Sequence, residues 1–180
     1  HTALTPDTTI VVEVDNLGDG DSHGGDGHAS FRPTSEPSSI VFDEMMETGA
    51  VVVGRRTIEQ AGFWGGEHHD GVPVFIPTHQ VPDTDPPGRL RYVTDGIESC
   101  VAQAKAAAGD RDVLLHGANT AQECLRAGVL DVLEIQLIPV LLGRGRLLFD
   151  GLEAGGIELD LVRTLEGPEA LHLRYEVRYQ

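Results

Sequence analysis

The sequence has few aromatic residues, only two cysteines, far fewer basic than acidic residues, and no long apolar run. A membrane-spanning helix needs about 20 consecutive apolar residues, so we expect no membrane contact. The 13 basic and 29 acidic residues give a formal net charge of -16, which disfavours binding to nucleic acid and to anionic membranes. No basic segment followed by an apolar stretch opens the chain, so we see no signal peptide and expect a cytoplasmic protein.

The two cysteines, Cys100 and Cys124, both fall on apolar faces of predicted helices. This placement favours buried free thiols over a disulfide, and their spacing fits no zinc site. The chain has 180 residues and is 40% hydrophobic, so it can bury one sizeable core. We therefore predict a single domain over residues 1–180.

Residues 15–39 show no hydrophobic periodicity and are rich in Gly, Asp, Ser, Pro and His, which predicts a long flexible loop. Asp19 and Asp21 only partly fit a calcium loop, because the glutamate that closes such a loop is missing. The run His68-His69-Asp70 also suggests a metal at first sight. Adjacent side chains usually diverge and no third ligand follows at a suitable spacing, so we interpret this run as a solvated loop and predict no metal site.

Two strand–glycine–helix units dominate the rest of the chain. In the first, the apolar run Val113–Leu115 leads through a small polar turn into a helix over Ala121–Ala127 that ends at Gly128. Such a turn directs unpaired backbone N–H groups at one spot, which is typical of phosphate sites. In the second, the strand 50–53 is followed by Gly54-Arg-Arg-Thr57. Arginine forms forked contacts to phosphate, so this unit predicts an anion site in an otherwise acidic chain.

The remaining pattern predicts strands and helices in alternation and then strands alone. Ser39 is the predicted cap of a helix over 40–48, and further strands are expected at 72–76 and 91–94, before a helix over 97–108. A mostly apolar stretch, 129–142, precedes two strands, 157–165 and 171–179, that are joined by Gly167-Pro168 as a hairpin. This order predicts an α/β fold with a mixed sheet, parallel in its centre and antiparallel at its C-terminal edge.

Five segments, 50–57, 92–99, 117–122, 125–131 and 138–143, together resemble the dihydrofolate-reductase-like family. Within that family the chain is most similar to the C-terminal reductase domain of the bifunctional riboflavin-biosynthesis deaminase-reductase, over roughly residues 39–177. The resemblance implies a three-layer sandwich with a largely parallel mixed sheet, an antiparallel C-terminal hairpin and helices on both faces. It implies NADPH as the hydride donor and a small pteridine- or pyrimidine-like heterocycle as the acceptor. Homodimers are common among the riboflavin-type members.

The resemblance also assigns cofactor-binding residues. The segment Val53, Gly54, Arg55, Arg56 and Thr57 would hold the pyrophosphate and the adenosine 2′-phosphate, and Thr78 and His79 would lie near the adenosine phosphate. The segment Gly117, Ala118, Asn119, Thr120 and Ala121 would lie against the pyrophosphate and the nicotinamide-side ribose. The family often has paired glycines at this last turn. This chain has His116 before Gly117, and that side chain could change how closely the backbone approaches the cofactor.

The front of the chain departs further from the family, whose first strand usually ends in a Ser-Leu-Asp-Gly-like segment that shapes the substrate pocket. Here residues 13–18 read Glu-Val-Asp-Asn-Leu-Gly. A buried carboxylate near the nicotinamide could supply or relay the proton that accompanies hydride transfer. Asp15 is the candidate for that acid, and Gln136 and Glu134 are further candidates for facing the pocket.

Three functional interpretations follow. The first is an NADPH-dependent reductase, the second is a non-catalytic binding protein of the same fold, and the third is a metal-dependent enzyme that uses the Asp- and His-rich loop.

The only tryptophan, Trp64, lies in the glycine-rich segment 62–66. It fits either a residue that closes over a ligand or an anchor at the edge of the core.

Overall fold

The structure is a computed structural model, and it describes residues 9–12, 33–139, 148–149, 151–152 and 156–180. Its strands are β1 (Thr9–Val12), β2 (Ala50–Val53), β3 (Val74–Pro77), β4 (Leu90–Val93), β5 (Val113–His116), β6 (Val132–Leu137), β7 (Ile157–Glu166) and β8 (Leu171–Tyr179). Its helices are α1 (Glu36–Met46), α2 (Arg55–Gln60), α3 (Ile97–Ala108) and α4 (Ala118–Arg126), with two 3₁₀ segments, η1 (Gly62–Gly66) and η2 (His69–Gly71), after α2.

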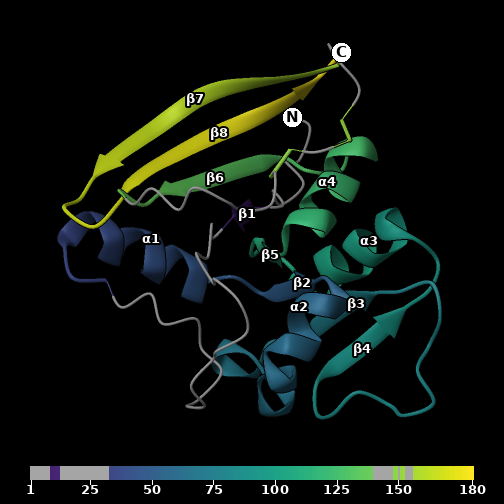
Figure 1. Cartoon of the computed structure of the whole chain (residues 1–180). Helices are drawn as coiled ribbons and strands as arrows, with labels where there is room; N and C mark the ends of the chain where they lie inside the picture. The colour runs from purple at the N-terminus through teal and green to yellow at the C-terminus, as the bar shows by residue number, and fades with distance from the viewer. Residues whose placement is uncertain (1–8, 13–32, 140–147, 150, 153–155) are drawn as a thin grey trace.

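The strands form two ladders that meet in one layer (Figure 1). The first ladder has the order β4-β3-β2-β5 and is parallel throughout. The second has the order β1-β6-β8-β7, in which β1 and β6 are parallel and the two pairs that involve β8 are antiparallel. Because β1 lies alongside β5, the ladders are neighbours. The predicted mixed sheet with an antiparallel C-terminal hairpin is confirmed.

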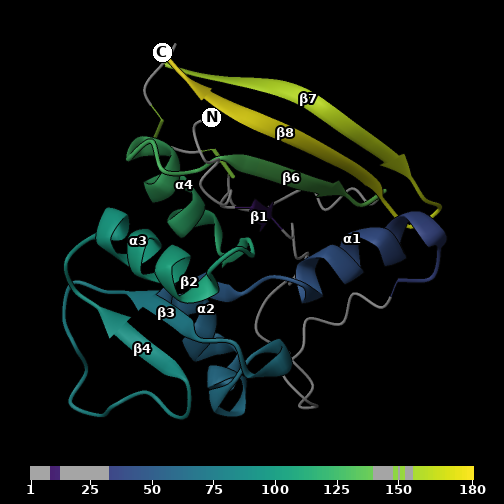
Figure 2. The ribbon, with the colours of Figure 1, turned by 180° about the vertical axis from the view of Figure 1, so that it is seen from behind.

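Helices cover both faces of this sheet, and each face has its own apolar cluster. Val52 and Leu115 belong to the cluster under α3 and α4. The alternate residues Val53 and Leu114 belong to the cluster on the side of α1 and α2. In the front and back views alike, α1 lies at the opposite side of the molecule from α3 and α4 (Figures 1 and 2). No helix in the described ranges is long and apolar enough to cross a membrane.

Two helices begin earlier than the sequence pattern predicts. Helix α1 begins at Glu36 after the cap residue Ser35, so the predicted start after Ser39 is wrong, and the predicted loop 15–39 does not extend over the last four of its residues. The reason is Pro37, which is tolerated in the first helical turn because its missing N–H has no intrahelical acceptor there. Helix α4 begins directly after Gly117 and not at the predicted Ala121, so this strand–helix turn is shorter than predicted. Helix α2 begins directly after Gly54, with both arginines in its first turn.

Segment η1 is a short left-handed turn. Residues 62–66 all have positive φ angles, which are 61°, 56°, 47°, 68° and 101° in chain order. Glycine adopts this conformation without strain, but Phe63 and Trp64 do so at a cost on the order of 1–2 kcal/mol each. Such strain persists only where the surrounding structure holds it, and both rings pack against the apolar cluster on the α1 side of the sheet.

Candidate functional site

The strand order of the parallel ladder reverses between β2 and β5. After β2 the chain adds β3 and β4 on one side of it, and it then returns to place β5 on the other side. In open α/β sheets ligands bind at such a switch point, outside the carboxyl ends of the strands. The two strand–glycine–helix units of the sequence are the units that end β2 and β5, so their turns are neighbours here.

The two turns fit together through small residues. A Cβ atom on Gly54 would lie 2.6 Å from Thr120 Oγ1, and one on Gly117 would lie 2.9 Å from Thr57 Oγ1. Gly117 also has a φ of 104°, a value that disfavours other residues. Each turn therefore needs its glycine to admit the threonine of the other. The nine-residue helix α4 directs the N–H groups of its first turn at the same place.

A cleft of about 590 Å³ opens at these turns and extends across the carboxyl ends of β2, β3, β4 and β5. The predicted cofactor residues that line it are Gly54, Arg55, Arg56, Thr57, Thr78, His79, Gly117, Ala118, Asn119 and Thr120. Val53 and Ala121 lie instead behind the cleft wall, buried in the two apolar clusters. The structure thus brings together segments that are up to 66 residues apart in the sequence (54 to 120).

The two arginines of the cleft differ in their partners. Arg55 Nε lies 2.6 Å from Glu59 Oε1, one helical turn along α2, and both side chains are 42% exposed. An exposed pair of this kind contributes little to stability, so it can exchange for a stronger anion. Within the described residues Arg56 makes no ion pair, and it is exposed on the cleft wall. Arg56 is therefore the more available cation for an anionic ligand.

His116 does not line the cleft, although it directly precedes Gly117. Its ring packs against Trp64 and His68, with centroid distances of 5.4 Å to each. Burial, and to a smaller degree the neighbouring His69, lower the pKa of His116 to about 4, so the ring is neutral near pH 7. The side chain at position 116 therefore does not fill the space in front of the turn.

The interpretation of His68-His69-Asp70 as a solvated loop is wrong for His69, which is 8% exposed. Its Nε2 lies 3.1 Å from the Thr48 carbonyl and 3.2 Å from the Thr48 hydroxyl, which explains the burial of a polar ring. His68 packs edge-on against Trp64 with a centroid distance of 4.6 Å. Among the described residues, no group of three or more His, Cys, Asp or Glu side chains could hold a metal ion.

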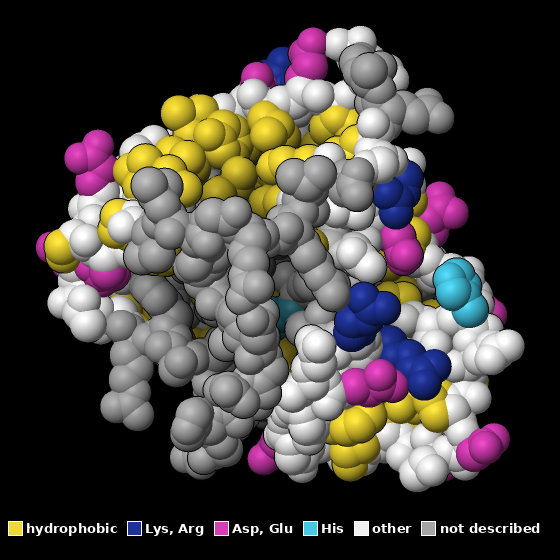
Figure 3. All heavy atoms as spheres, viewed as in Figure 1, with side chains coloured by type: hydrophobic (Ala, Val, Ile, Leu, Met, Phe, Trp, Pro, Cys, Tyr) yellow, Lys and Arg dark blue, Asp and Glu magenta, His cyan; other side chains and the backbone are white. Residues whose placement is uncertain are grey.

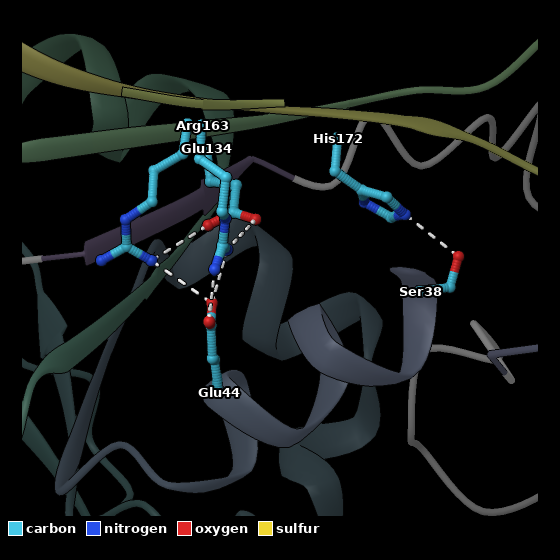
Figure 4. Close-up of polar contacts among 6 residues, drawn as sticks. Ser38, Glu44, Glu134, Arg163 and His172 are labelled. Carbon is cyan, nitrogen blue, oxygen red and sulfur yellow. Dashed lines mark hydrogen bonds and ion pairs between the residues drawn. The ribbon is translucent and has the colours of Figure 1, made fainter. Parts of the chain in front are cut away.

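A polar layer lies between α1 and the strands β6, β8 and β7. Glu134 on β6 is 1% exposed and is contacted by Arg163 Nη2 at 3.3 Å and by Arg174 Nη1 at 3.2 Å. Both arginines also reach Glu44 on α1, where Arg163 binds in a bidentate way at 2.5 and 2.6 Å (Figure 4). Burial raises the pKa of Glu134, whereas the hydrogen bond from Arg163 lowers the pKa of Glu44.

The same layer continues under the first turns of α1. Ser38 Oγ lies 3.0 Å from His172 Nε2, and both residues are fully buried (Figure 4). Gln136 is paired with His172 across β6 and β8 and is 2% exposed. Its Nε2 has no hydrogen-bond partner in the described part of the chain. The third acid–base candidate, Asp15, lies outside the described residues.

Sequence reasoning missed Glu44, Arg163 and Arg174, and it missed the burial of His172. The alternation of β8 carried the signal, because it places His172 and Arg174 on one face and Leu171, Leu173 and Tyr175 on the other. The sequence does not say which face a helix covers.

A second cavity of about 750 Å³ lies beside the Glu44–Arg163 pair and is also lined by Thr48 and by residues 110–112, which precede β5. It therefore lies toward the amino ends of the strands, away from the cleft.

Comparisons with known proteins agree with this fold. A riboflavin biosynthesis protein from Shewanella sp. PV-4 superposes with a TM-score of 0.65 at 20% identity, over 84% of this chain and 83% of that one. A pyrimidine reductase-like protein from Corynebacterium diphtheriae gives 0.63 at 11% identity, over 98% and 93%. Dihydrofolate reductase from Enterococcus faecalis, solved with NADP(H), gives 0.57 at 19% identity, over 96% of both chains.

No curated protein matches the sequence. The model of the RibD C-terminal domain family matches residues 19–173, which include both strand–glycine–helix units and the hairpin as far as Leu173. That range covers most of the chain and contains every described residue that lines the cleft. The chain belongs to the RibD C-terminal domain family.

Proposed function

We propose that this protein is a reductase that uses NADPH to transfer hydride to a small pteridine- or pyrimidine-like heterocycle. Membership in the RibD C-terminal domain family supports an oxidoreductase of this general kind. The observation that carries the proposal is the cleft at the switch point, where two glycine turns and the Arg55-Arg56 pair meet. A dinucleotide needs closely approaching backbone for its pyrophosphate and separate cations for a terminal phosphate, and this cleft offers both.

The residues of the cleft fit such a cofactor. The absence of a side chain at Gly117 and the first turn of α4 favour the pyrophosphate on that side. Arg56, with Arg55, would take the 2′-phosphate of the adenosine ribose. Thr78 lies in the neighbouring loop, where its hydroxyl donates to the Gln80 carbonyl at 2.9 Å and so orders the loop after β3. When bound, the cofactor would supply the hydride.

The acceptor heterocycle would bind on the α1 side of the sheet. Gln136 is the described candidate to contact it, because a buried amide that has no partner among the described residues can donate a hydrogen bond to a ring carbonyl. Glu134 is poorly suited, since both of its carboxylate oxygens are held by arginines. Asp15 is retained as a candidate acid of the pocket, as its place in the sequence after β1 suggests.

Titration of the purified protein with NADPH, followed by nicotinamide fluorescence, tests this function. We expect saturable binding that prefers NADPH to NADH by at least about tenfold, because a charge-assisted hydrogen bond to phosphate contributes about 1.5–3 kcal/mol. Equal affinity for the two nucleotides, or no binding to either, would contradict the proposal. A parallel titration with NADH in the same buffer is the control, since it differs only by the 2′-phosphate.

A non-catalytic binding protein of the same fold is the alternative. The observation that favours it is the ion pair between Arg55 and Glu59, which occupies one of the two cleft arginines. Such a protein would bind no nicotinamide nucleotide, or it would bind NADPH without oxidising it in the presence of any pteridine or pyrimidine. Following NADPH absorbance with a panel of both ring types therefore separates the two functions.

A further inference from the structure

The cleft at the switch point is lined by two carboxylates, although its proposed ligand is an anion. They belong to Glu59 on α2 and Glu123 on α4, so they lie on walls that different helices contribute. A carboxylate in an anion site repels the ligand unless a cation neutralises it or the ligand offers it a hydrogen-bond donor. Each of the two acids therefore needs its own explanation.

The two acids differ in whether the protein neutralises them. Glu59 Oε1 lies 2.6 Å from Arg55 Nε, one turn away on the same helix. Glu123 is partly buried, and its side chain has no ion pair or hydrogen bond with another described residue. Arg126, three residues further along α4, has its Nη1 atom 3.5 Å from the Gly151 carbonyl instead. Glu123 is therefore the cleft carboxylate that a ligand can use.

The helical period of α4 determines where Glu123 points. Cys124 and Leu125 are buried in the apolar cluster under this helix. Residues three or four apart share one face of a helix, so Glu123 lies on the face of Asn119 and Thr120, which also line the cleft. Long side chains of a helix lean toward its N-terminus. The Glu123 carboxylate is therefore directed into the cleft and toward the first turn of α4.

The part of the cleft that Glu123 shares with α3 suits a flat base. Helices α3 and α4 lie side by side on one face of the sheet, and the start of α3 lines the cleft (Figures 1 and 2). Ile97 and Pro77 give this part an apolar wall, and a Cβ on Gly96 would have no atom within 4 Å. The acceptor and the nicotinamide belong on the opposite, α1 side, which leaves the α3 side for the adenine.

The adenosine half of NADPH has few donors to offer a carboxylate. Its phosphates and ring nitrogens only accept hydrogen bonds, and its 2′-oxygen carries a phosphate. The remaining donors are the ribose 3′-hydroxyl and the exocyclic amino group of adenine. The 3′-hydroxyl lies between two phosphates, so a carboxylate there would face strong repulsion. The amino group is at the end of the base away from both phosphates, and it is therefore the better partner for Glu123.

We propose that Glu123 determines the base specificity of the cofactor site by accepting a hydrogen bond from the amino group of adenine. An ionised carboxylate only accepts, so it favours a base with a donor at this position. It disfavours hypoxanthine and guanine, which have a carbonyl oxygen there. The arginines would select the 2′-phosphate, whereas Glu123 selects the base. This role rests on the proposed function, because it requires a nicotinamide dinucleotide in the cleft.

The first test measures binding and needs no turnover. Isothermal titration calorimetry compares NADPH with reduced nicotinamide hypoxanthine dinucleotide phosphate, which has a carbonyl oxygen where adenine has its amino group. Wild type should bind NADPH at least about tenfold more tightly, as expected for a hydrogen bond to a charged group. In Glu123→Gln this ratio should fall below about threefold, because an amide can either accept or donate. A wild-type ratio near one, or an unchanged ratio in folded Glu123→Gln, would overturn the role.

Glu59→Gln is the matched control, because the same substitution removes the other carboxylate of the cleft. Both cofactors carry the 2′-phosphate, so their dissociation constants should change together and their ratio should stay within about twofold of the wild-type ratio. An equal loss of discrimination in Glu59→Gln would assign the effect to the total charge of the cleft and not to Glu123. Circular dichroism identifies a variant that does not fold, and Glu123→Ala, with the same expected ratio, then replaces Glu123→Gln.

The second test uses adenosine 2′,5′-bisphosphate, which has the base and phosphates of the adenosine half but no nicotinamide. Glu123→Gln should weaken this fragment and NADPH by a similar factor, about tenfold. Weaker binding of NADPH alone would place Glu123 at the nicotinamide half, and weaker binding of both with an unchanged base ratio would place it at the ribose. Either result would contradict the role and leave the proposed function intact. Absence of NADPH binding to wild type would contradict the proposed function and this role with it.

Discussion

Adjacent residues of one motif can differ in what they offer a ligand, and Arg55 and Arg56 do so here. Both were predicted from the sequence as phosphate ligands, and both line the cleft. The difference is Glu59, one turn along α2, which binds Arg55 Nε at 2.6 Å. An i, i+4 acidic neighbour is visible in the sequence, but its choice of partner depends on side-chain rotamers that a pattern does not specify.

This difference predicts unequal effects of neutral replacements. Arg56→Gln should weaken NADPH binding about 10- to 100-fold and leave NADH binding within about twofold, since only NADPH carries the 2′-phosphate. Glu59→Gln should tighten NADPH binding a few-fold, because it releases Arg55. Isothermal titration calorimetry of wild type and both variants with each nucleotide measures these dissociation constants. A loss of NADH affinity equal to that of NADPH in Arg56→Gln would indicate a damaged fold rather than a lost phosphate contact.

Among secondary-structure elements, the parts predicted best were those whose signal is local. The apolar runs of β2 and β5 and the helix α3 were predicted within one or two residues, because burial on both faces or a helical period suffices to define them. The cleft could be predicted as well, since both of its turns are encoded next to their strands. The helix starts and the polar layer could not. They depend on contacts such as Glu44–Arg163, whose partners are 119 residues apart.

The element most dependent on long-range contacts is α1, which the polar layer attaches to the hairpin. Glu134 is almost completely buried and relies on two arginines, so removing one of them leaves a poorly compensated charge. We predict that Arg174→Met lowers the free energy of unfolding at pH 7 by about 3 kcal/mol. Glu44→Gln, which changes a partly exposed carboxylate, should cost about 1 kcal/mol. Urea unfolding followed by circular dichroism measures both values.

The stability lost in Arg174→Met should depend on pH, and the direction of this dependence can be predicted. Burial already raises the folded-state pKa of Glu134 above its usual value of 4.5, and loss of Arg174 raises it further. When a carboxyl has a higher pKa in the folded than in the unfolded protein, the free energy of unfolding decreases as the pH rises from the unfolded-state pKa to the folded-state pKa. The deficit of Arg174→Met relative to wild type should therefore shrink as the pH is lowered toward 4.5, where Glu134 becomes neutral. A deficit that grows toward low pH would contradict the assignment of the buried charge to Glu134.

For the whole molecule, the notable feature is a group of exposed apolar side chains on the sheet face opposite α1, at strand positions beyond the cluster under α3 and α4. Strand register puts Leu137, Leu159 and Leu161 on the same face as the partly buried residues Tyr175 and Val177. These leucines are 55%, 40% and 55% exposed, and hydrophobic side chains gather over the strands β6, β8 and β7 in Figure 3. The opposite face of the same strands carries the polar layer and is covered by α1. An exposed apolar face of this kind marks an interaction surface.

We predict that this face joins two copies of the chain in a homodimer with two-fold symmetry, the arrangement expected from riboflavin-type members of the family. Size-exclusion chromatography with light scattering should give twice the chain mass of 19.3 kDa for wild type at micromolar concentration. Leu161→Arg should shift the protein to the monomer, because it places a charge in the centre of an apolar contact. Val81→Arg is the matched control, since Val81 is 54% exposed but lies in the loop between β3 and β4. A wild-type protein that stays monomeric at tens of micromolar, or a Leu161→Arg variant that remains a dimer, would show that this face does not join the copies.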